Sequence, residues 1–156
     1  MTLPTPSNDT VSNSSCLIAL EATAHLDLLP RLYQAVLVPS AVASEWGTSP
    51  PAWLKVQAAG NRPFVQALRL QLGPGEAEAI ALAVEIGASR LILDDRRARR
   101  VASGFQVPIT GTVGIVLRAK QAGLIPLARP VLDVMRAAGF RLADPLYQQA
   151  LQLAGE

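Results

Sequence analysis

No stretch constrains the fold more than residues 75–100, which read GEAEAIALAVEIGASRLILDDRRARR. The first half has a helical pattern over Glu76–Ile86, and a glycine follows directly, as is common just past a helix end. The second half predicts a buried strand over Arg90–Leu93, followed by two acids, Asp94 and Asp95. A helix that leads into a strand is half of a parallel α/β unit. In open parallel sheets, binding and catalysis occur just outside the carboxyl ends of the strands, where these two acids stand.

The helical pattern also predicts how the acids of this segment are oriented. Successive helical residues turn by about 100°, which places Ile80 and Val84 within about 80° of Glu76. We therefore expect Glu76 to head the apolar stripe that packs on the sheet, and Glu78 and Glu85 to face water. The alternative is that Glu76 is only a first-turn acid favoured by the helix dipole.

Short strands and helices alternate along the rest of the chain. Further strands are predicted over Thr10–Ser12, Ala35–Val38, Trp53–Val56 and Val107–Ile109. Further helices are predicted over Cys16–Ala24, Leu26–Leu32, Ala41–Trp46, Pro63–Leu70, residues 96–103, Val113–Ala122, Ala128–Ala138 and residues 144–153. We expect residues 1–9 to form a flexible tail and residues 10–156 to form one α/β domain. The predicted fold is a three-layer α/β/α sandwich with a short parallel sheet of four or five strands and a C-terminal helical hairpin.

Five polar residues, at four places along the chain, converge on one edge of this predicted sheet. Asn13 ends the first strand, Glu45 lies just inside the helix after the second, Glu76 starts the central helix, and Asp94 and Asp95 follow the third main strand. Carboxylates gather against their mutual repulsion when a cation offsets it, and Mg²⁺ and Mn²⁺ prefer oxygen ligands. The sequence therefore predicts a site for a hard divalent cation at this edge.

Composition excludes several other kinds of site. The chain has one cysteine and one histidine, so it contains no Cys/His zinc spacing and no internal disulfide. The glycines at positions 73 and 75 lack the lysine of a phosphate-binding loop, and no serine stands in a nucleophile-elbow pattern. A net charge of +2 and a pI of about 9.1 are weak evidence for a polyanionic partner. Without a signal-peptide pattern or a membrane-length apolar run, we expect a cytoplasmic location and no membrane partner.

Several of these candidates also have simpler interpretations. Glu45 could be a solvated helix acid, and one of Asp94 and Asp95 is expected to be only the N-cap of the next helix. The arginines between Arg96 and Arg100 suit a solvated helix face as well as an RNA-binding face. Apolar residues are numerous in the last two helices, which predicts self-association or a protein partner there.

Five segments together resemble a known family. They are VSNSSCLIAL at Val11–Leu20, VLVPSAVASEW at Val36–Trp46, GEAEAIALA at Gly75–Ala83, LILDDRRARRVA at Leu91–Ala102 and TGTVGIVLRAKQAGLIP at Thr110–Pro126. In this order they resemble the PIN-domain family of metal-dependent ribonucleases, and especially a bacterial and archaeal subfamily near the VapC-type toxins. The resemblance covers nearly the whole chain after the expected tail.

The resemblance implies an endoribonuclease that depends on Mg²⁺ or Mn²⁺ and acts as the toxin of a toxin–antitoxin pair. Its partners would be an RNA substrate, an antitoxin protein and a second copy of the chain. The implied metal ligands are Asn13, Glu45, Glu76 and Asp94, with Asp95 as a catalytic neighbour. The hydroxyl groups that the family places near the site would fall at Ser14 or Ser15 and at Thr110 or Thr112.

The chain departs from the family pattern at two positions of the first loop. Asn13 stands where catalytic members have an acid, and Ser15-Cys16 stands where a Ser-Pro step is common. A second hypothesis is therefore a PIN-like domain with impaired catalysis that acts as a protein- or RNA-binding module. A third is an unrelated α/β domain that binds a small molecule.

Overall fold

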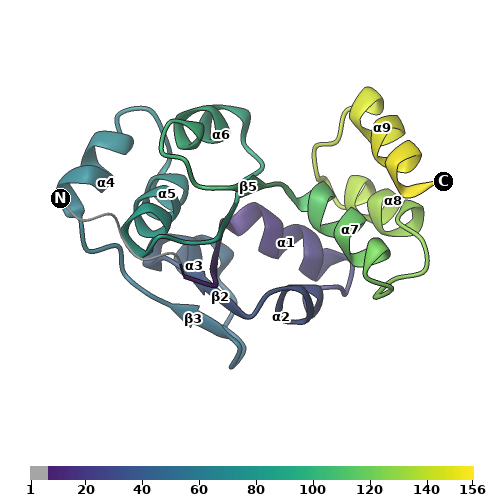
Figure 1. Ribbon diagram of the computed structural model, residues 1–156, viewed down its shortest axis with the longest axis horizontal. Helices are drawn as coiled ribbons and strands as arrows, with labels where there is room; N and C mark the ends of the chain where they lie inside the picture. Colours follow the sequence, from purple (N-terminus) through teal and green to yellow (C-terminus); the bar gives the residue numbers. More distant parts are fainter. Residues whose placement is uncertain (1–6) are drawn as a thin grey trace.

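A parallel sheet of five strands forms the centre of the computed structural model, which describes residues 7–156 (Figure 1). The strands are β1 (Asp9–Ser12), β2 (Ala35–Val38), β3 (Leu54–Val56), β4 (Arg90–Ile92) and β5 (Ile109–Thr110). Their order across the sheet is β3-β2-β1-β4-β5, and all four pairings are parallel. The predicted α/β class, parallel sheet and strand number are confirmed.

Helices cover both faces of this sheet and extend beyond one end of it. They are α1 (Ser14–Ala22), α2 (Leu28–Leu32), α3 (Ser40–Trp46), α4 (Arg62–Leu68), α5 (Pro74–Ile86), α6 (Arg96–Ser103), α7 (Thr112–Gln121), α8 (Arg129–Ala137) and α9 (Asp144–Ala154). Helices α4, α5 and α6 lie on one side, α1, α2 and α7 lie on the other, and α8 and α9 pack outside α7 (Figure 1). In the part of the chain that is described, no helix is long and apolar enough to cross a membrane.

The strands divide their side chains between two hydrophobic cores. Val36 and Val38 of β2 contribute to the core beneath α1 and α7, whereas Leu37 contributes to the core beneath α5. In β4, Ile92 contributes to the core beneath α1 and α7, and Leu91 contributes to the core beneath α5. This alternation is the two-residue period of a strand, and apolar residues on both faces are expected where helices cover both sides of a parallel sheet.

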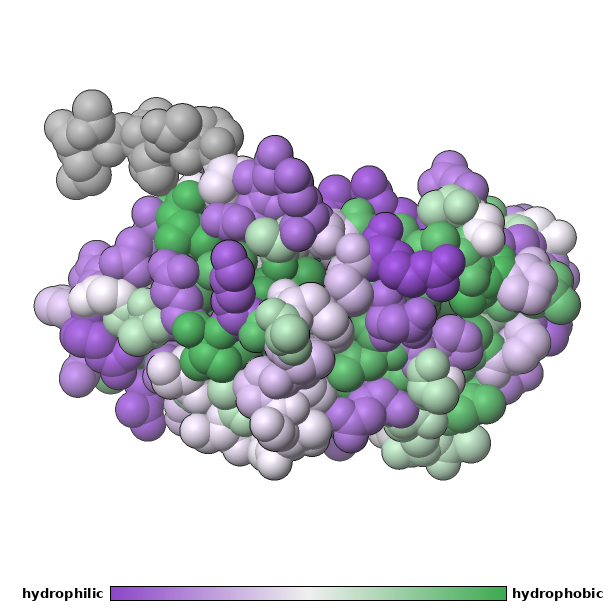
Figure 2. Space-filling view, turned by 90° about the horizontal axis from the view of Figure 1, so that it is seen from below, coloured by the Kyte–Doolittle hydropathy of each residue, from purple (hydrophilic) through white to green (hydrophobic). Residues whose placement is uncertain are grey.

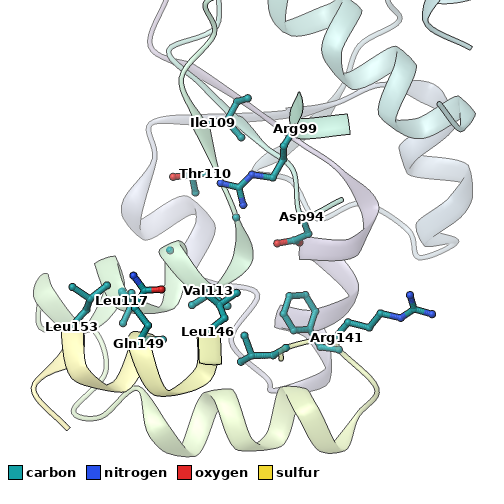
Figure 3. A pocket seen from close by; sticks show the side chains of 15 residues that line it. Asp94, Arg99, Ile109, Thr110, Val113, Leu117, Arg141, Leu146, Gln149 and Leu153 are labelled. Atoms are coloured by element: carbon teal, nitrogen blue, oxygen red, sulfur yellow. The ribbon is translucent and has the colours of Figure 1, made fainter. Parts of the chain in front are cut away.

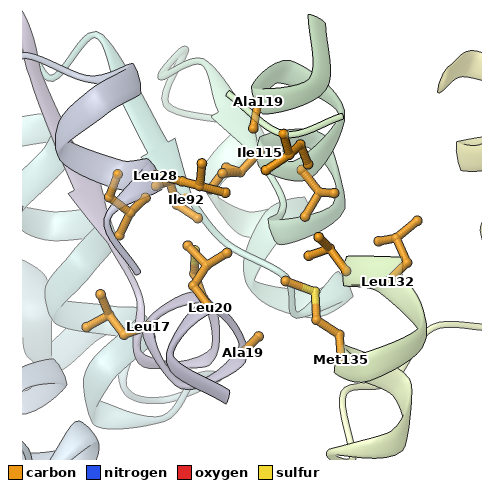
Figure 4. Close-up of a cluster of buried hydrophobic side chains, with 14 of the residues drawn as sticks. Leu17, Ala19, Leu20, Leu28, Ile92, Ile115, Ala119, Leu132 and Met135 are labelled. Atoms are coloured by element: carbon orange, nitrogen blue, oxygen red, sulfur yellow. The ribbon is translucent and has the colours of Figure 1, made fainter. Parts of the chain in front are cut away.

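The larger core also joins the C-terminal helices to the sheet. Leu17 and Leu20 of α1 belong to the same hydrophobic cluster as Ile115 of α7 and Met135 of α8 (Figure 4), and all four side chains are fully buried. In the two last helices most large apolar residues are buried, and the exposed large ones are Val134, Leu146 and Leu153. The helical hairpin therefore buries most of its apolar surface within the chain.

A carboxylate also fastens this C-terminal region. The side chain of Glu156 accepts hydrogen bonds from the backbone N–H groups of Ala128 and Arg129 and from Lys120, at 2.7 to 3.0 Å. The bond from the N–H of Ala128, with those from Arg129 and Lys120, lowers the pKa of Glu156 to about 2. The N-terminus of α8 is thus tied to the end of α9 by a charged acceptor.

The orientation predicted for the acids of α5 is wrong for Glu78. Its residue is only 9% exposed, and its Oε1 accepts a hydrogen bond of 3.3 Å from the backbone N–H of Ala41, at the start of α3. Its Oε2 lies 3.9 Å from the guanidinium of Arg62. Every residue from Ala77 to Ala83 is buried, because α3, α4 and the sheet surround α5. An apolar stripe therefore does not identify one inward-facing side of this helix.

The predicted N-terminal tail is only partly described, because residues 1–6 lie outside the described part of the chain. Ser7 donates its backbone N–H to the carbonyl oxygen of Gly87 at 3.0 Å, and Asp9 already belongs to β1.

On the face displayed in Figure 2, hydrophobic and hydrophilic residues alternate in small areas.

The buried carboxylate of Glu78 yields a prediction about stability. Glu78→Ala removes the acceptor for the N–H of Ala41, so we expect the free energy of unfolding to fall by about 1–3 kcal/mol. A urea titration followed by circular dichroism measures this change. The control is Asp27→Ala, which removes an exposed acid 3.6 Å from Arg31 and should change stability by about 0.5 kcal/mol or less. Equal losses in the two variants would contradict the assigned role of Glu78.

Candidate active site at the carboxyl ends of the strands

Asn13 follows β1 directly and begins α1. Its backbone N–H donates to the carbonyl oxygen of Ile92 at 3.1 Å, which continues the pairing of β1 with β4 by one residue. Its side-chain Oδ1 accepts the backbone N–H of Cys16 at 3.2 Å, so Asn13 is the N-cap of α1. Asparagine is among the residues best suited to that position. The residue is 3% exposed, so its amide group lies within the edge of the sheet.

Glu45 connects three elements through one carboxylate. Its Oε2 accepts the hydroxyl of Ser14, in the first turn of α1, at 2.8 Å. Its Oε1 accepts the backbone N–H of Gly75, at the start of α5, at 3.0 Å. A Cβ atom on Gly75 would lie 2.8 Å from the carboxyl carbon of Glu45, so the close approach requires glycine there. Glu45 is exposed to solvent, and these two hydrogen bonds hold its carboxylate in place.

Asp94 lies just after β4 and faces the start of α7. Its Oδ1 accepts the backbone N–H of Thr112 at 2.7 Å, and its Oδ2 accepts the hydroxyl of the same residue at 2.6 Å. Gly111 allows this approach, because a Cβ there would lie 3.1 Å from Oδ1 of Asp94 and 3.0 Å from a guanidinium nitrogen of Arg99. Asp94 thus joins β4 to α7 and has a cation from α6 nearby.

The environment of Asp94 disfavours its charge overall. Burial raises the pKa of Asp94 above its ordinary value, and the two hydrogen bonds from Thr112 and the charge of Arg99 oppose that rise. The neighbouring thiol of Cys16 is fully buried, and burial together with the charge of Asp94 raises its pKa. A buried thiol with a raised pKa is unreactive, so Cys16 is a packing residue.

These contacts place both Glu45 and Asp94 near the first turn of α1. Ser14 of that turn contacts Glu45, Asn13 caps the turn, and Cys16 of the same turn is close enough to Asp94 for its charge to affect the thiol. Among residues 7–156, no three His, Cys, Asp or Glu side chains lie close enough together to share a metal ion. The donors gathered here are therefore two carboxylates supplemented by amide and hydroxyl oxygens.

The other two predicted acids make contacts elsewhere. The Oε2 of Glu76 accepts the backbone N–H of Gly73 at 3.1 Å, which is the reciprocal contact of a capping box at the start of α5. Asp95 accepts the backbone N–H of Ala98 at 2.8 Å as the N-cap of α6, in agreement with the prediction that one of the two aspartates is a cap. Both acids stabilise helix starts in the structure, and their place in a metal site stays a prediction.

The structure also separates the alternative hydroxyl groups. Ser14 and Thr112 contact the acids, whereas the hydroxyl of Thr110 accepts a hydrogen bond from Arg90 at 3.1 Å. Sequence reasoning missed the N–H of Gly75 and the cation of Arg99. Glycine before a helical acid was a visible signal for close backbone approach. No sequence signal distinguished Arg99 from its three arginine neighbours in α6.

The fold and the position of the acids define the class of protein: a parallel α/β domain with an acidic candidate site at the carboxyl edge of its sheet. A family model described as a PIN domain matches residues 9–156. The chain therefore belongs to the PIN-domain family, a family of nucleases. Searches of curated proteins and of solved structures each returned no match.

The contacts of Asp94 predict how its titration responds to substitution. Thr112→Val keeps the shape of the side chain but removes a hydroxyl that lowers the pKa of Asp94, so the pKa should rise further. A ¹³C carboxyl titration by NMR measures this shift. Thr110→Val is the control and should leave the pKa of Asp94 unchanged, since that hydroxyl is bonded to Arg90. A fall in the Thr112→Val protein would contradict the assigned hydrogen bond.

Proposed function

We propose that this PIN domain is an endoribonuclease that depends on Mg²⁺ or Mn²⁺ and hydrolyses RNA phosphodiester bonds. The observation that carries the proposal is that Glu45 and Asp94 both lie near the first turn of α1, which the amide of Asn13 caps. All of these donors are oxygens or can present one. Hard divalent ions prefer such donors and keep several water ligands.

The residues present fit a cation of this kind. A carboxylate has about four lone-pair sites, so Glu45 and Asp94 can each accept their two observed hydrogen bonds and still bind an ion. Glu76 could join them only if its carboxylate left the N–H of Gly73. When bound, the ion would polarise a phosphoryl oxygen and lower the pKa of a water molecule.

The protein residues would have separate tasks in this proposal. Ser14 and Gly75 hold the carboxylate of Glu45, and Thr112 holds that of Asp94, so the two ligands are positioned before an ion arrives. Arg99 would attract the phosphate of an RNA strand towards Asp94. Because only the ionised form of Asp94 binds a cation, metal affinity should fall with decreasing pH. That fall should begin at a higher pH than for an ordinary aspartate, since the pKa of Asp94 is raised.

A role as a toxin with an antitoxin partner is the finer part of the same proposal. Val134 and Leu153 remain exposed on the C-terminal helices, with 48% and 71% of their surface accessible. These residues support a protein contact on α8 and α9, with an antitoxin or a second copy of the chain. The alternative of a PIN domain with impaired catalysis rests on Asn13, because its cap role needs no negative charge.

The two neighbouring aspartates provide a matched test of the metal site. Asp94→Asn should lower the rate of Mn²⁺-dependent cleavage of a structured RNA by about a hundredfold or more, because a charged ligand is lost. Asp95→Asn should change the rate by less than about threefold, since asparagine replaces aspartate well at an N-cap. Single-turnover cleavage and Mn²⁺ calorimetry measure the effects. Equal effects of the two changes, or binding unaltered by Asp94→Asn, would overturn the site.

A second test adds the charge that the family pattern has at position 13. Asn13→Asp keeps an acceptor for the N–H of Cys16, so the fold should persist. The extra charge should raise Mn²⁺ affinity about tenfold, or by roughly 1–2 kcal/mol. Faster cleavage by Asn13→Asp would identify the native chain as an impaired nuclease, and an unchanged or lower rate would identify a complete native site. Absence of metal-dependent cleavage in both proteins would favour the binding-module hypothesis.

A further inference from the structure

A cleft of about 350 Å³ opens beside Asp94 and runs between two parts of the chain that are distant in sequence (Figure 3). The junction of β5 and α7 forms one wall, and residues 140–142 with α9 form the other. Asp94 and Arg99 lie at one end, so the cleft is continuous with the candidate active site. Its volume is within the range of about 300–1,000 Å³ that is usual for ligand sites.

The lining of the cleft changes character along its length. Away from Asp94 the walls are apolar, with Val113, Leu117 and Leu146 facing one another in Figure 3. Phe140 adds the aromatic side chain of this lining, and the amide of Gln149 adds a group that can both donate and accept hydrogen bonds. An apolar slot with a few polar groups selects a flat, partly polar ligand.

One guanidinium group borders this slot. Arg99 lies near Asp94 without an ion pair, whereas Arg141 starts from the opposite wall and its guanidinium extends away from the other labelled residues (Figure 3). Among the described residues, Arg99 forms no ion pair with a carboxylate within 4.0 Å. The cation of Arg99 is therefore available to an anionic ligand that enters the cleft.

We propose that this cleft binds one unpaired nucleobase of a single-stranded RNA, next to the phosphodiester that lies at Asp94. The inference rests on the proposed nuclease function and adds to it the site that positions the substrate. Proteins hold unpaired bases by stacking them on aromatic rings and guanidinium planes and by hydrogen bonds to their edges. Phe140 supplies an aromatic ring, Gln149 supplies a hydrogen-bonding amide, and Arg99 supplies a cation for the adjoining phosphate.

A nucleotide satisfies the cleft better than a protein segment does. An apolar peptide would cover Leu117 and Leu146 but would leave the guanidinium group of Arg99 without an anion. A nucleotide presents a flat base and a phosphate in one covalent unit, which matches an apolar slot that ends in a cation. The continuity of the cleft with Asp94 also places that phosphate beside the proposed cation site.

Two substitutions test the cleft without touching the acids. Phe140→Leu removes the aromatic face and keeps an apolar side chain. Gly114→Leu adds a side chain to the wall; its Cβ would meet only Thr110, at the ordinary contact distances of 3.8 and 3.9 Å. The matched control is Phe105→Leu, because Phe105 is 40% exposed and packs edge-on against Phe64, outside the cleft.

The measurement is fluorescence anisotropy with a labelled five-nucleotide single-stranded RNA in EDTA, so that binding is read without cleavage. We expect the Kd to rise about tenfold for Phe140→Leu and for Gly114→Leu, and to change by less than about twofold for Phe105→Leu. The abasic version of the RNA should bind the native protein more weakly than the complete RNA does. Its Kd should be the same for the native protein and for Phe140→Leu. A 4-thiouridine in the RNA should cross-link to residues 140–149.

Several results would overturn the inference. The first is an unchanged Kd in both cleft variants, and the second is the absence of RNA binding by the native chain. The third is cross-linking only to the arginine face of α6. The fourth is a changed oligomeric state of Gly114→Leu with an unchanged Kd, because that result would mean that a protein occupies the cleft. Mn²⁺-dependent cleavage by the same proteins is scored separately. If the protein cleaves RNA but the cleft substitutions do not weaken binding, the nuclease proposal is kept and the base site is rejected. If the cleft substitutions weaken binding but no cleavage occurs, only the nuclease proposal is rejected.

Discussion

The parallel pairing of β1 between β2 and β4 is the constraint on which the rest of the structure depends. Its register sets Ser12 beside Ile92, and the N–H of Asn13 continues the pairing to the carbonyl oxygen of Ile92. The carboxyl ends of the two strands therefore meet, and the residues that follow them must lie on one edge of the sheet. Asn13 and Asp94 owe their proximity to this register, and the first turn of α1 grows from the same point.

Hydrogen bonds to backbone N–H groups then fix the acids at this edge. Glu45 accepts the N–H of Gly75, Asp94 accepts that of Thr112, and Asn13 accepts that of Cys16. Each of these donors lies in the first turn of a helix, where N–H groups lack partners within the helix. The same contacts that complete α1, α5 and α7 therefore also position the candidate ligands, so the stability of the fold and the geometry of the site are coupled.

The sequence was sufficient for the architecture and for part of the site. Short apolar runs, and glycines between them and the helices, predicted a parallel sheet of four or five strands, and the structure has five. Helical phase failed for Glu78, because α5 is buried on most of its circumference and its apolar stripe has no single direction. Asp94 and Asp95 are neighbours in the sequence but have different hydrogen-bond partners. Asp94 accepts the hydroxyl of Thr112, whereas Asp95 accepts the backbone N–H of Ala98. Which aspartate faces which partner depends on where β4 ends, and the ends of strands are poorly determined by sequence pattern alone.

The central claim is that Glu45 and Asp94 hold one divalent cation beside the first turn of α1. The most direct measurement is an anomalous difference map from crystals of the protein grown with Mn²⁺. The account predicts a peak within about 2.0–2.6 Å of oxygens from both Glu45 and Asp94, the range usual for oxygen ligands of hard divalent ions. A peak bound to only one of these residues, a peak elsewhere on the protein, or no peak at saturating Mn²⁺ would contradict it.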